Sequence, residues 1–370
     1  MKNPFNPAFG TQPSRFLGRD EIVAAFKNAI INQNSPWRST IITGVRGAGK
    51  TAILSSIANF IETQPKTISV RVLANEDVLN EILSQLYYQL PKDIFEHFPE
   101  LTGLSIRGVQ FKMNDNGTPD PDFTQNFRSQ AELMLKAFAE RQINVVILLD
   151  EVQKHTNELR KFVAAYQLFL QAGYPVSLLM AGLPNAIMDI LNDDVLTFLR
   201  RANRVALSGV DIDLIADDFI RTFSMVDKQI SRENACKAAE LTTGYPYLIQ
   251  LMGYYMWEMS GDEITDDVVV QAQSVAKRSV FQNVLDLIFY NATNVEQRFM
   301  VSMAMDEKRT KNAELVERLG ENTSYISQYR MRLMHAGIIK PAGYGYVQFT
   351  LPYMREYIQN IIETGEYFVE

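Results

Sequence analysis

The chain has too few thiol and imidazole side chains for a disulfide framework or a His/Cys metal centre. Its 370 residues include one cysteine, Cys236, and three histidines. A single cysteine cannot close an internal disulfide, and so small a set of His and Cys argues against a metal site built from them. The composition therefore excludes a disulfide-stapled scaffold and disfavours a zinc protein.

Long apolar runs are missing as well. The most apolar stretch, residues 245–257, is interrupted by Gln250 and is shorter than the roughly 20 residues that a bilayer-spanning helix needs. The N-terminus reads Met-Lys-Asn-Pro-Phe, with polar residues and proline where a secretory signal peptide has an apolar core. We therefore expect a cytoplasmic protein without a membrane partner.

The chain also has no excess of positive charge. It holds 36 Lys and Arg against 43 Asp and Glu, a formal net charge of −7. This balance excludes a surface that is basic all over but allows a local basic patch. Apolar residues make up 46% and charged residues 21%, as in ordinary globular proteins. A chain of this length is too long for one core and predicts about two or three domains.

The first half of the chain alternates short apolar runs with helical patterns. Such an alternation indicates a parallel sheet that is covered by helices on both faces. The expected strands are Ser39–Thr43, Thr67–Val72, Val145–Leu149, Val176–Met180 and, as a fifth candidate, Arg204–Leu207. Residues 104–113 alternate apolar and polar side chains before a loop at 114–122, which predicts a β insertion without chemistry of its own.

After Gly209 the pattern becomes purely helical, with expected helices at 211–225, 232–241, 246–259 and 266–290. Thr293 and Glu296 then have the spacing of a capping box, which starts a new unit. Three helices and a glycine-turned hairpin follow, the pattern of a winged helix-turn-helix. The expected α/β architecture is a P-loop core with an N-terminal arm at 1–208, an all-α lid at 209–291 and a winged helix-turn-helix at 292–370.

Residues 44–51 read Gly-Val-Arg-Gly-Ala-Gly-Lys-Thr, a P-loop placed directly between a strand and a helix. Its glycines let backbone N–H groups surround phosphates, Lys50 reaches the β- and γ-phosphates, and the Thr51 hydroxyl ligates magnesium. The sequence therefore predicts ATP and Mg²⁺ as ligands. The residues expected to line the nucleotide are Gly44, Arg46, Gly47, Ala48, Gly49, Lys50, Thr51 and Ala52.

Two acids follow the strand at 145–149 and supply the second half of such a site. Asp150 is expected to hold magnesium through water, and Glu151 to align and activate the attacking water. An acidic start to the next helix, favoured by the helix dipole, is the alternative interpretation of the pair. Beside a P-loop, the catalytic interpretation is favoured.

Together these motifs resemble the AAA+ ATPases, in the branch near the origin-recognition initiators and the STAND switch ATPases. Residues 16–20, Phe-Leu-Gly-Arg-Asp, are similar to the box that both groups place beside the adenine, which implies contacts from Gly18 and Arg19. Residues 243–246, Thr-Gly-Tyr-Pro, are similar to the Gly-x-Pro motif of STAND lids, which implies that Pro246 approaches the base. Without the resemblance, the first segment reads equally well as a simple helix start.

The sequence departs from the family pattern at two places. The end of the fourth core strand reads Met-Ala-Gly-Leu-Pro at 180–184, where AAA+ enzymes carry a polar sensor, with Asn185 as the nearest substitute. The lid arginine of the initiators is absent near 244–248. The resemblance therefore implies good ATP binding and slow hydrolysis.

A basic stretch stands where this branch carries its intersubunit arginine finger. Arg200, Arg201 and Arg204 lie there, and the resemblance implies a homo-oligomer whose ATP sites are completed by a neighbour. We expect Arg200 or Arg201 to act catalytically in this way. A solvated basic helix end remains the alternative interpretation.

The expected recognition helix, residues 323–333, separates an apolar face from a polar one. Ile326 and Leu333 share the first face because they lie seven residues apart. The side chains expected to reach DNA base edges are Ser324, Ser327, Gln328 and Arg332. Phosphate contacts are expected from Arg330 and Lys340, together with Lys308, Arg309 and Lys311.

The basic footprint of this unit is modest. Between residues 306 and 341, seven Lys and Arg stand against five Asp and Glu. A protein contact through Tyr344, Tyr346 and Met331 is the alternative to duplex DNA. The favoured hypothesis is a magnesium-dependent AAA+ ATPase, initiator- or loader-like, that couples nucleotide state to DNA binding. A STAND-like switch with a protein partner is the second hypothesis, and a P-loop kinase is disfavoured because no small-substrate site is evident.

Overall fold

The computed structural model describes residues 2–8, 17–32, 34–91, 123–152, 156–194 and 196–367. The β insertion predicted at residues 104–113 and the loop predicted at 114–122 lie outside these ranges.

Five parallel strands form the central sheet, in the order β2-β3-β4-β1-β5. Each of the five sheet strands expected from the sequence is present, and the predicted α/β fold class is confirmed. The strands are β1 (Ser39–Thr43), β2 (Thr67–Leu73), β3 (Asn144–Val152), β4 (Val176–Gly182) and β5 (Asn203–Ala206). The loop that follows β1 opens at the carboxyl edge of the sheet, between the ends of β4 and β5, where ligands of such sheets bind.

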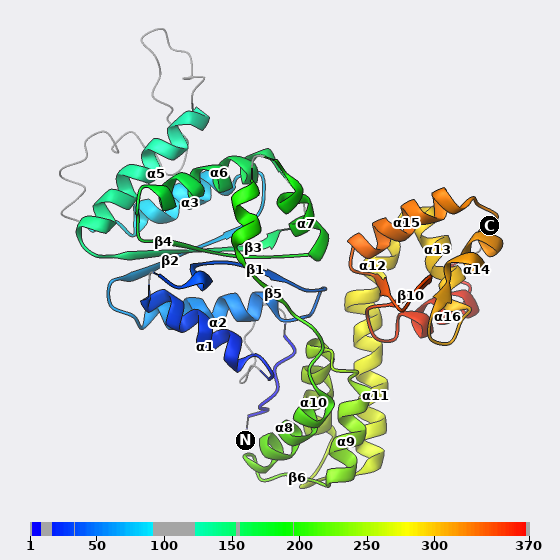
Figure 1. The fold of residues 1–370 in the computed structure, drawn as a ribbon. Helices are drawn as coiled ribbons and strands as arrows, with labels where there is room; N and C mark the ends of the chain where they lie inside the picture. The colour runs from blue at the N-terminus through cyan, green and yellow to red at the C-terminus, as the bar shows by residue number, and fades with distance from the viewer. Residues whose placement is uncertain are drawn as a thin grey trace.

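Helices cover both faces of the sheet (Figure 1). One face carries α1 (Asp20–Ile31) and α2 (Lys50–Glu62), and the other carries α3 (Val78–Tyr88), α5 (Phe123–Glu140), α6 (Asn157–Gln171) and α7 (Pro184–Asn192). Successive strand residues supply the two apolar layers: Ile41 belongs to the layer of α3 to α7, and Ile42 to the layer of α1 and α2. Side chains that alternate between two buried faces explain why these strands read as continuous apolar runs.

The second part of the chain is a helical lid below the core (Figure 1). Its helices are α8 (Ile212–Ser224), α9 (Arg232–Leu241), α10 (Pro246–Met259) and α11 (Asp266–Val280), with a two-stranded pair, β6 (Gln229–Ile230) and β7 (Glu263–Ile264). A π-helical turn, η4 (Phe281–Leu285), joins α11 to α12 (Asp286–Tyr290), so the predicted helix at 266–290 runs without a break. Among the described residues, no helix has the length and apolarity to cross a bilayer.

The C-terminal unit has the arrangement of a winged helix. Its elements are α13 (Asn294–Ala304), β8 (Thr310–Lys311), α14 (Asn312–Leu319), α15 (Thr323–His335), β9 (Ile339–Pro341), β10 (Tyr346–Phe349) and α16 (Met354–Glu363). The capping box of Thr293 and Glu296 is present, and Gly320, in the left-handed region at φ 66°, ends α14. The last helix begins at Met354, and Tyr353 takes a left-handed conformation (φ 60°) at its N-cap.

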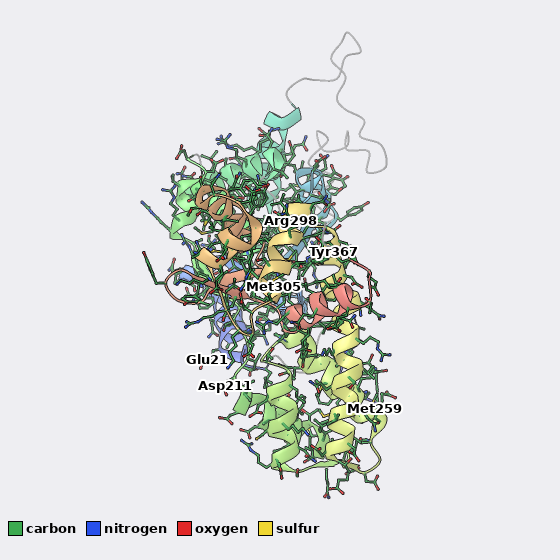
Figure 2. All side chains as sticks on the ribbon, turned by 90° about the vertical axis from the view of Figure 1, so that its right-hand side faces the viewer. Glu21, Asp211, Met259, Arg298, Met305 and Tyr367 are labelled. Atoms are coloured by element: carbon green, nitrogen blue, oxygen red, sulfur yellow. The ribbon has the colours of Figure 1, made fainter. Side chains whose placement is uncertain are left out.

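The lid and the winged helix share one apolar core. Phe219 of the lid and Leu333 of the winged helix belong to the same cluster of buried side chains. Figure 2 shows the lid, which carries Met259, below the unit that carries Arg298 and Met305. The boundary predicted between residues 291 and 292 falls within this continuous packing and stays a prediction.

The N-terminal arm is anchored on the lid. Phe5 is 4% exposed and its ring lies 5.8 Å from that of Phe219 and 5.2 Å from that of Phe223. The Phe5 ring packs directly on the backbone of α10 at Gly253, where a Cβ would lie 2.2 Å from the ring. Only glycine leaves room for this contact. The backbone N–H of Asn6 donates to the side-chain oxygen of Gln250 at 3.1 Å.

Candidate functional site

The P-loop connects the end of β1 to the first turn of α2 and is held in place by its own lysine. The Lys50 ammonium group donates to the carbonyl oxygens of Gly44 at 2.8 Å and Val45 at 2.9 Å. An ammonium group has three donors, so one N–H is left for a phosphate oxygen. Gly47 (φ 73°) and Gly49 (φ 92°) take left-handed conformations that only glycine adopts without strain.

Burial lowers the pKa of Lys50 to about 8, although the charges of Asp150 and Glu151 oppose the shift. The nearby charge of Arg46 adds to the lowering. A buried cation is stabilised by an anion beside it, so a bound phosphate chain favours the charged form of Lys50. The electrostatics of the loop therefore suit a nucleotide.

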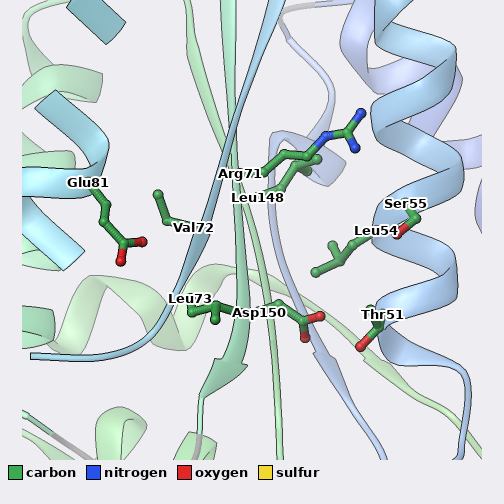
Figure 3. Close-up of a pocket in the computed structure, with 9 residues that line it drawn as sticks. All are labelled: Thr51, Leu54, Ser55, Arg71, Val72, Leu73, Glu81, Leu148 and Asp150. Atoms are coloured by element: carbon green, nitrogen blue, oxygen red, sulfur yellow. The ribbon is translucent and has the colours of Figure 1, made fainter. Parts of the chain in front are cut away.

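The magnesium ligands expected from the sequence face each other. Figure 3 shows the Asp150 carboxylate at the end of β3 directed toward the Thr51 hydroxyl at the start of α2. Both line a cleft of about 220 Å³, together with Leu54, Ser55, Arg71, Val72, Leu73, Glu81 and Leu148. A hydroxyl and a carboxylate are oxygen donors of the kind that Mg²⁺ takes alongside water and substrate phosphates, so these residues fit the ion.

Glu151 stands at an irregularity of β3. Its backbone is left-handed (φ 56°), and the pairing of β3 with β4 shifts register between Leu149 and Val152. The Glu151 N–H donates to the Asp150 carboxylate at 2.8 Å. A left-handed backbone at a non-glycine residue costs about 1 to 3 kcal/mol, and such residues cluster at active sites as well as in turns. The strain at Glu151 therefore fits the predicted catalytic role.

The sensor position at the end of β4 has no polar side chain, as expected. It holds Ala181 and Gly182, and a Cβ on Gly182 would lie 2.5 Å from the Val152 carbonyl oxygen. The bulge of β3 thus occupies the space of any larger residue there. The side chain of Asn185 lies outside the described part of the chain.

The segment predicted to lie beside the adenine meets the hinge between core and lid. Gly18 has a left-handed conformation (φ 66°), and the Arg19 guanidinium donates to the carbonyl of Ser208. Burial lowers the pKa of Arg19. On the other side of the hinge, the Val210 N–H donates to the Gly244 carbonyl at 2.8 Å. The motif at residues 16–20 and the lid motif at residues 243–246 therefore both contact the hinge at residues 208–210.

Pro246 is the first residue of α10 and is half-buried. The lid residue before it makes the contact that sequence reasoning missed. The Tyr245 hydroxyl donates to the carbonyl oxygen of Arg46 in the P-loop at 2.8 Å. Tyr245 stands inside the Thr-Gly-Tyr-Pro motif, but no sequence pattern assigns a partner to a tyrosine hydroxyl almost 200 residues away.

The basic stretch after α7 is a 3₁₀ turn, η3 (Thr197–Arg201), that leads into β5. Arg200 is bound locally, because its Nε donates to the Leu191 carbonyl at 2.8 Å. Arg204 donates to the Arg200 carbonyl at 3.4 Å. Arg201 is exposed and has no hydrogen-bond or ion-pair partner within the described ranges. All three arginines are exposed, and Arg201 differs from the other two because its guanidinium donates to no carbonyl oxygen of the described chain.

The predicted recognition helix is α15, and its faces are as expected. Ile326 and Leu333 are buried, whereas Ser324, Ser327 and Gln328 are exposed. The Arg332 guanidinium lies 4.9 Å from the Tyr329 ring, which in turn lies 4.8 Å from the Tyr325 ring. Lys340 on β9 is exposed, while Arg330 is half-buried and its buried Nε has no partner in the described chain.

The winged helix reaches the P-loop itself, which the sequence did not reveal. A Cβ on Gly337, just after α15, would lie 3.3 Å from a methyl group of Val45. The two parts line one cleft of about 200 Å³, to which Val45, Arg46 and Leu183 contribute from the core and Leu333, Ala336, Gly337, Ile338 and Leu351 from the winged helix. The helix expected to bind DNA thus ends against the loop expected to bind phosphate.

Two family models match separate parts of the chain, one in the core and one in the C-terminal region. Residues 15–179 match the AAA ATPase domain, and residues 282–358 match a domain of unknown function, DUF8462. The first match includes the P-loop, the acidic pair, the strands β1, β2 and β3, and the first part of β4. The resemblance to AAA+ P-loop ATPases is therefore confirmed, and residues 15–179 form an AAA ATPase domain. No match to the chain is found among curated proteins.

Solved structures share the fold over almost the whole chain. The Walker-type ATPase PABY2304 of Pyrococcus abyssi has a TM-score of 0.63 at 13% identity, covering 94% of this chain and 97% of its own. The ORC2 protein of Aeropyrum pernix, in its ADP form, has a TM-score of 0.55 at 12% identity, covering 98% of each chain. At these identities the likeness shows the fold alone.

Proposed function

We propose that the protein is a magnesium-dependent ATPase that couples its nucleotide state to duplex DNA binding through the C-terminal winged helix, in the manner of an initiator or loader. Lys50 and the backbone N–H groups of the P-loop bind the phosphates, and Thr51 and Asp150 hold the ion. Bound Mg²⁺ neutralises charge that develops on the phosphates. Glu151 aligns and activates the attacking water, and residues 208–210 form the hinge by which the lid responds.

The contact between the P-loop and the winged helix is the observation that carries this proposal. Val45 lies in the loop that is proposed to bind the phosphates, and its side chain lies against Gly337 at the end of α15. Packed interfaces tend to switch between discrete arrangements rather than deform continuously. A change in the loop therefore alters the position of the recognition helix without an intermediate element.

Slow hydrolysis is part of the proposal. Ala181 and Gly182 leave the sensor position without a polar group near the attacking water, and the close approach of Val152 keeps it so. Removing a single donor that stabilises charge in a transition state typically costs a factor of about 100 to 1,000 in rate. ATP binding requires none of these groups and is expected to be unaffected.

The DNA surface consists of the exposed polar face of α15 and the neighbouring strand β9. Ser324, Ser327 and Gln328 supply groups that hydrogen-bond with base edges, and Arg332 is oriented by its contact with the Tyr329 ring. Lys340 on β9 and Arg330 on α15 are assigned to phosphates. The proposed partner is a DNA duplex, with neighbouring copies of the chain completing the ATP sites.

The test is binding of a labelled random duplex across a salt series, with ATP and Mg²⁺ and without them. The variant that combines Arg330→Ala with Lys340→Ala should bind more weakly, and its salt slope should fall by about two because each phosphate contact contributes about 0.9. The matched control is Lys136→Ala, an exposed lysine on α5, which should bind like the wild type. Equal binding with and without ATP would contradict the coupling, and no binding at low salt would contradict the DNA partner.

The second candidate function is a STAND-like switch that hydrolyses little ATP and contacts a protein through the winged helix. Tyr344 favours it, because this side chain is fully exposed at the hairpin turn between two left-handed glycines, Gly343 and Gly345. Met331 on α15 is 44% exposed beside the polar face. Absence of duplex binding together with retained ATP binding is the result expected from the switch.

A further inference from the structure

The lid contributes a side chain to the outer surface of the P-loop. Tyr245 is 6% exposed, and its hydroxyl donates to the Arg46 carbonyl oxygen at 2.8 Å. With the two carbonyls held by Lys50, three consecutive carbonyls of the loop, those of Gly44, Val45 and Arg46, are fixed by side-chain donors. Lys50 belongs to the loop, whereas Tyr245 comes from the lid.

The peptide bond between Arg46 and Gly47 transmits this contact to the phosphate side. A trans peptide is planar, so its C=O and N–H point in opposite directions, and the structure has no cis peptide in its described chain. A donor that holds the Arg46 carbonyl on one side therefore directs the Gly47 N–H to the other. Within the described residues this N–H has no protein acceptor. We propose that Tyr245 is a positioning residue that orients the Gly47 N–H for a nucleotide phosphate.

The close approach of the lid to the P-loop depends on a glycine in each of them. A Cβ on Gly47 would lie 2.1 Å from the Tyr245 hydroxyl oxygen, so no other residue at 47 permits this contact. On the lid side, Gly244 (φ 75°) packs so closely that its Cβ would lie 2.5 Å from the Val210 carbonyl oxygen. The Tyr245 N–H donates to the Thr242 carbonyl at 2.9 Å. The ring is thus fixed by its own turn and by the hinge.

The hydroxyl acts as a donor under all ordinary conditions. Burial, the largest cause, raises the pKa of Tyr245 far above its usual value, and the neighbouring Tyr247 adds to the rise. The proton therefore stays on the oxygen. A carbonyl acceptor requires such a donor, and phenylalanine at this position would preserve the ring while removing the bond.

This inference rests on the proposed ATP site and specifies how the lid acts on it. The backbone N–H groups of a P-loop cradle the α- and β-phosphates. We assign the Gly47 N–H, in the middle of the loop, to the β-phosphate, which ATP and ADP have and AMP lacks. Loss of the Tyr245 hydroxyl should therefore weaken ATP and ADP binding and leave AMP binding unchanged. A role in lid packing alone would change the binding of all three nucleotides by the same factor.

The experiment titrates wild type and Tyr245→Phe with ATP, ADP and AMP by competition against a fluorescent ATP analogue. We expect the variant to bind ATP and ADP about two- to tenfold more weakly, the usual worth of one hydrogen bond, with AMP unchanged. The control is Tyr247→Phe, whose hydroxyl accepts from Asn283 at 3.4 Å and does not contact the loop. This variant should bind all three nucleotides like the wild type.

Two results would overturn the inference. Unchanged ATP affinity in Tyr245→Phe would show that the hydroxyl does not position the loop, and an equal loss for AMP would show a packing role. Wild-type protein that binds no ATP would contradict the proposed function itself. Melting temperatures of the two phenylalanine variants, expected within a few degrees of the wild type, separate a local effect on the loop from a loss of folded protein.

Discussion

At the scale of single residues, Glu151 combines a catalytic assignment with a strained backbone. Its left-handed φ of 56° is stabilised by the neighbouring carboxylate, which accepts its N–H, and by the register shift between Leu149 and Val152. Strain of this kind persists where the side chain is needed in a particular direction. The backbone of Glu151 therefore carries the cost in stability, and its side chain carries the proposed gain in activity.

Two substitutions at Glu151 separate these parts. Glu151→Gly should stabilise the protein by about 1 kcal/mol, because glycine takes positive φ without strain, and should abolish turnover. Glu151→Gln should leave stability and ATP binding unchanged and also abolish turnover. Denaturant unfolding and phosphate release measure the two effects. Hydrolysis at the wild-type rate in Glu151→Gln would remove Glu151 from the mechanism, and a destabilised Glu151→Gly would show that its backbone is not strained.

The sequence predicts the residues whose neighbours in the chain define their role, and it does not predict those whose role depends on a distant contact. Lys50 and Thr51 follow from a local motif, since strand, loop and helix are contiguous. Asp150 follows from the end of a buried strand. Tyr245 and Val45 gain their significance from partners in other parts of the chain, and only the folded geometry brings these partners together.

At the scale of elements, the N-terminal arm has a buried anchor that its sequence does not predict. Prolines at positions 4, 7 and 13 predict an extended segment, and residues 2–8 lie along the lid with one side chain, Phe5, buried. A single aromatic residue in a proline-rich stretch has no periodicity to reveal a buried face. The helices of the lid, in contrast, follow from their apolar spacing and from caps such as Asp211, whose side chain accepts the N–H groups of the first turn.

Phe5→Ala tests the anchoring of the arm. Truncating a buried aromatic side chain typically costs about 3 to 5 kcal/mol, because the apolar contacts are lost and a cavity remains. We expect a loss of this size in the unfolding of the lid and winged helix, which share one core. Asn6→Ala, an exposed change in the same arm, should stay within about 0.5 kcal/mol. Equal effects of the two changes in chemical denaturation would show that the arm does not stabilise the lid.

At the scale of the whole molecule, the ATPase core, the lid and the winged helix converge on the P-loop. The lid touches it through Tyr245, the winged helix through Gly337, and the hinge is held between Arg19 and Gly244. Arg201 lies on η3, which leads into β5, and it is exposed. The proposed function assigns to it the group that a neighbouring copy supplies in trans.

Arg201 is therefore expected to act on the ATP site of a neighbouring copy. An arginine that stabilises transition-state charge is worth a factor of about 10³ to 10⁵ in rate when it is supplied in trans. ATP hydrolysis per chain should rise with protein concentration as copies assemble, and Arg201→Ala should abolish the rise while leaving ATP binding unchanged. The matched control is Arg204→Ala on the same segment, whose guanidinium donates to the Arg200 carbonyl and which should retain the rise. Mixing Arg201→Ala with the inactive Glu151→Gln gives the decisive measurement. Activity should be partly restored, because a site held by the Arg201→Ala chain has an intact Glu151 and receives an intact Arg201 from a Glu151→Gln neighbour. A mixture as inactive as its components, or a rate per chain that is independent of concentration in the wild type, would place the source of the missing charge elsewhere.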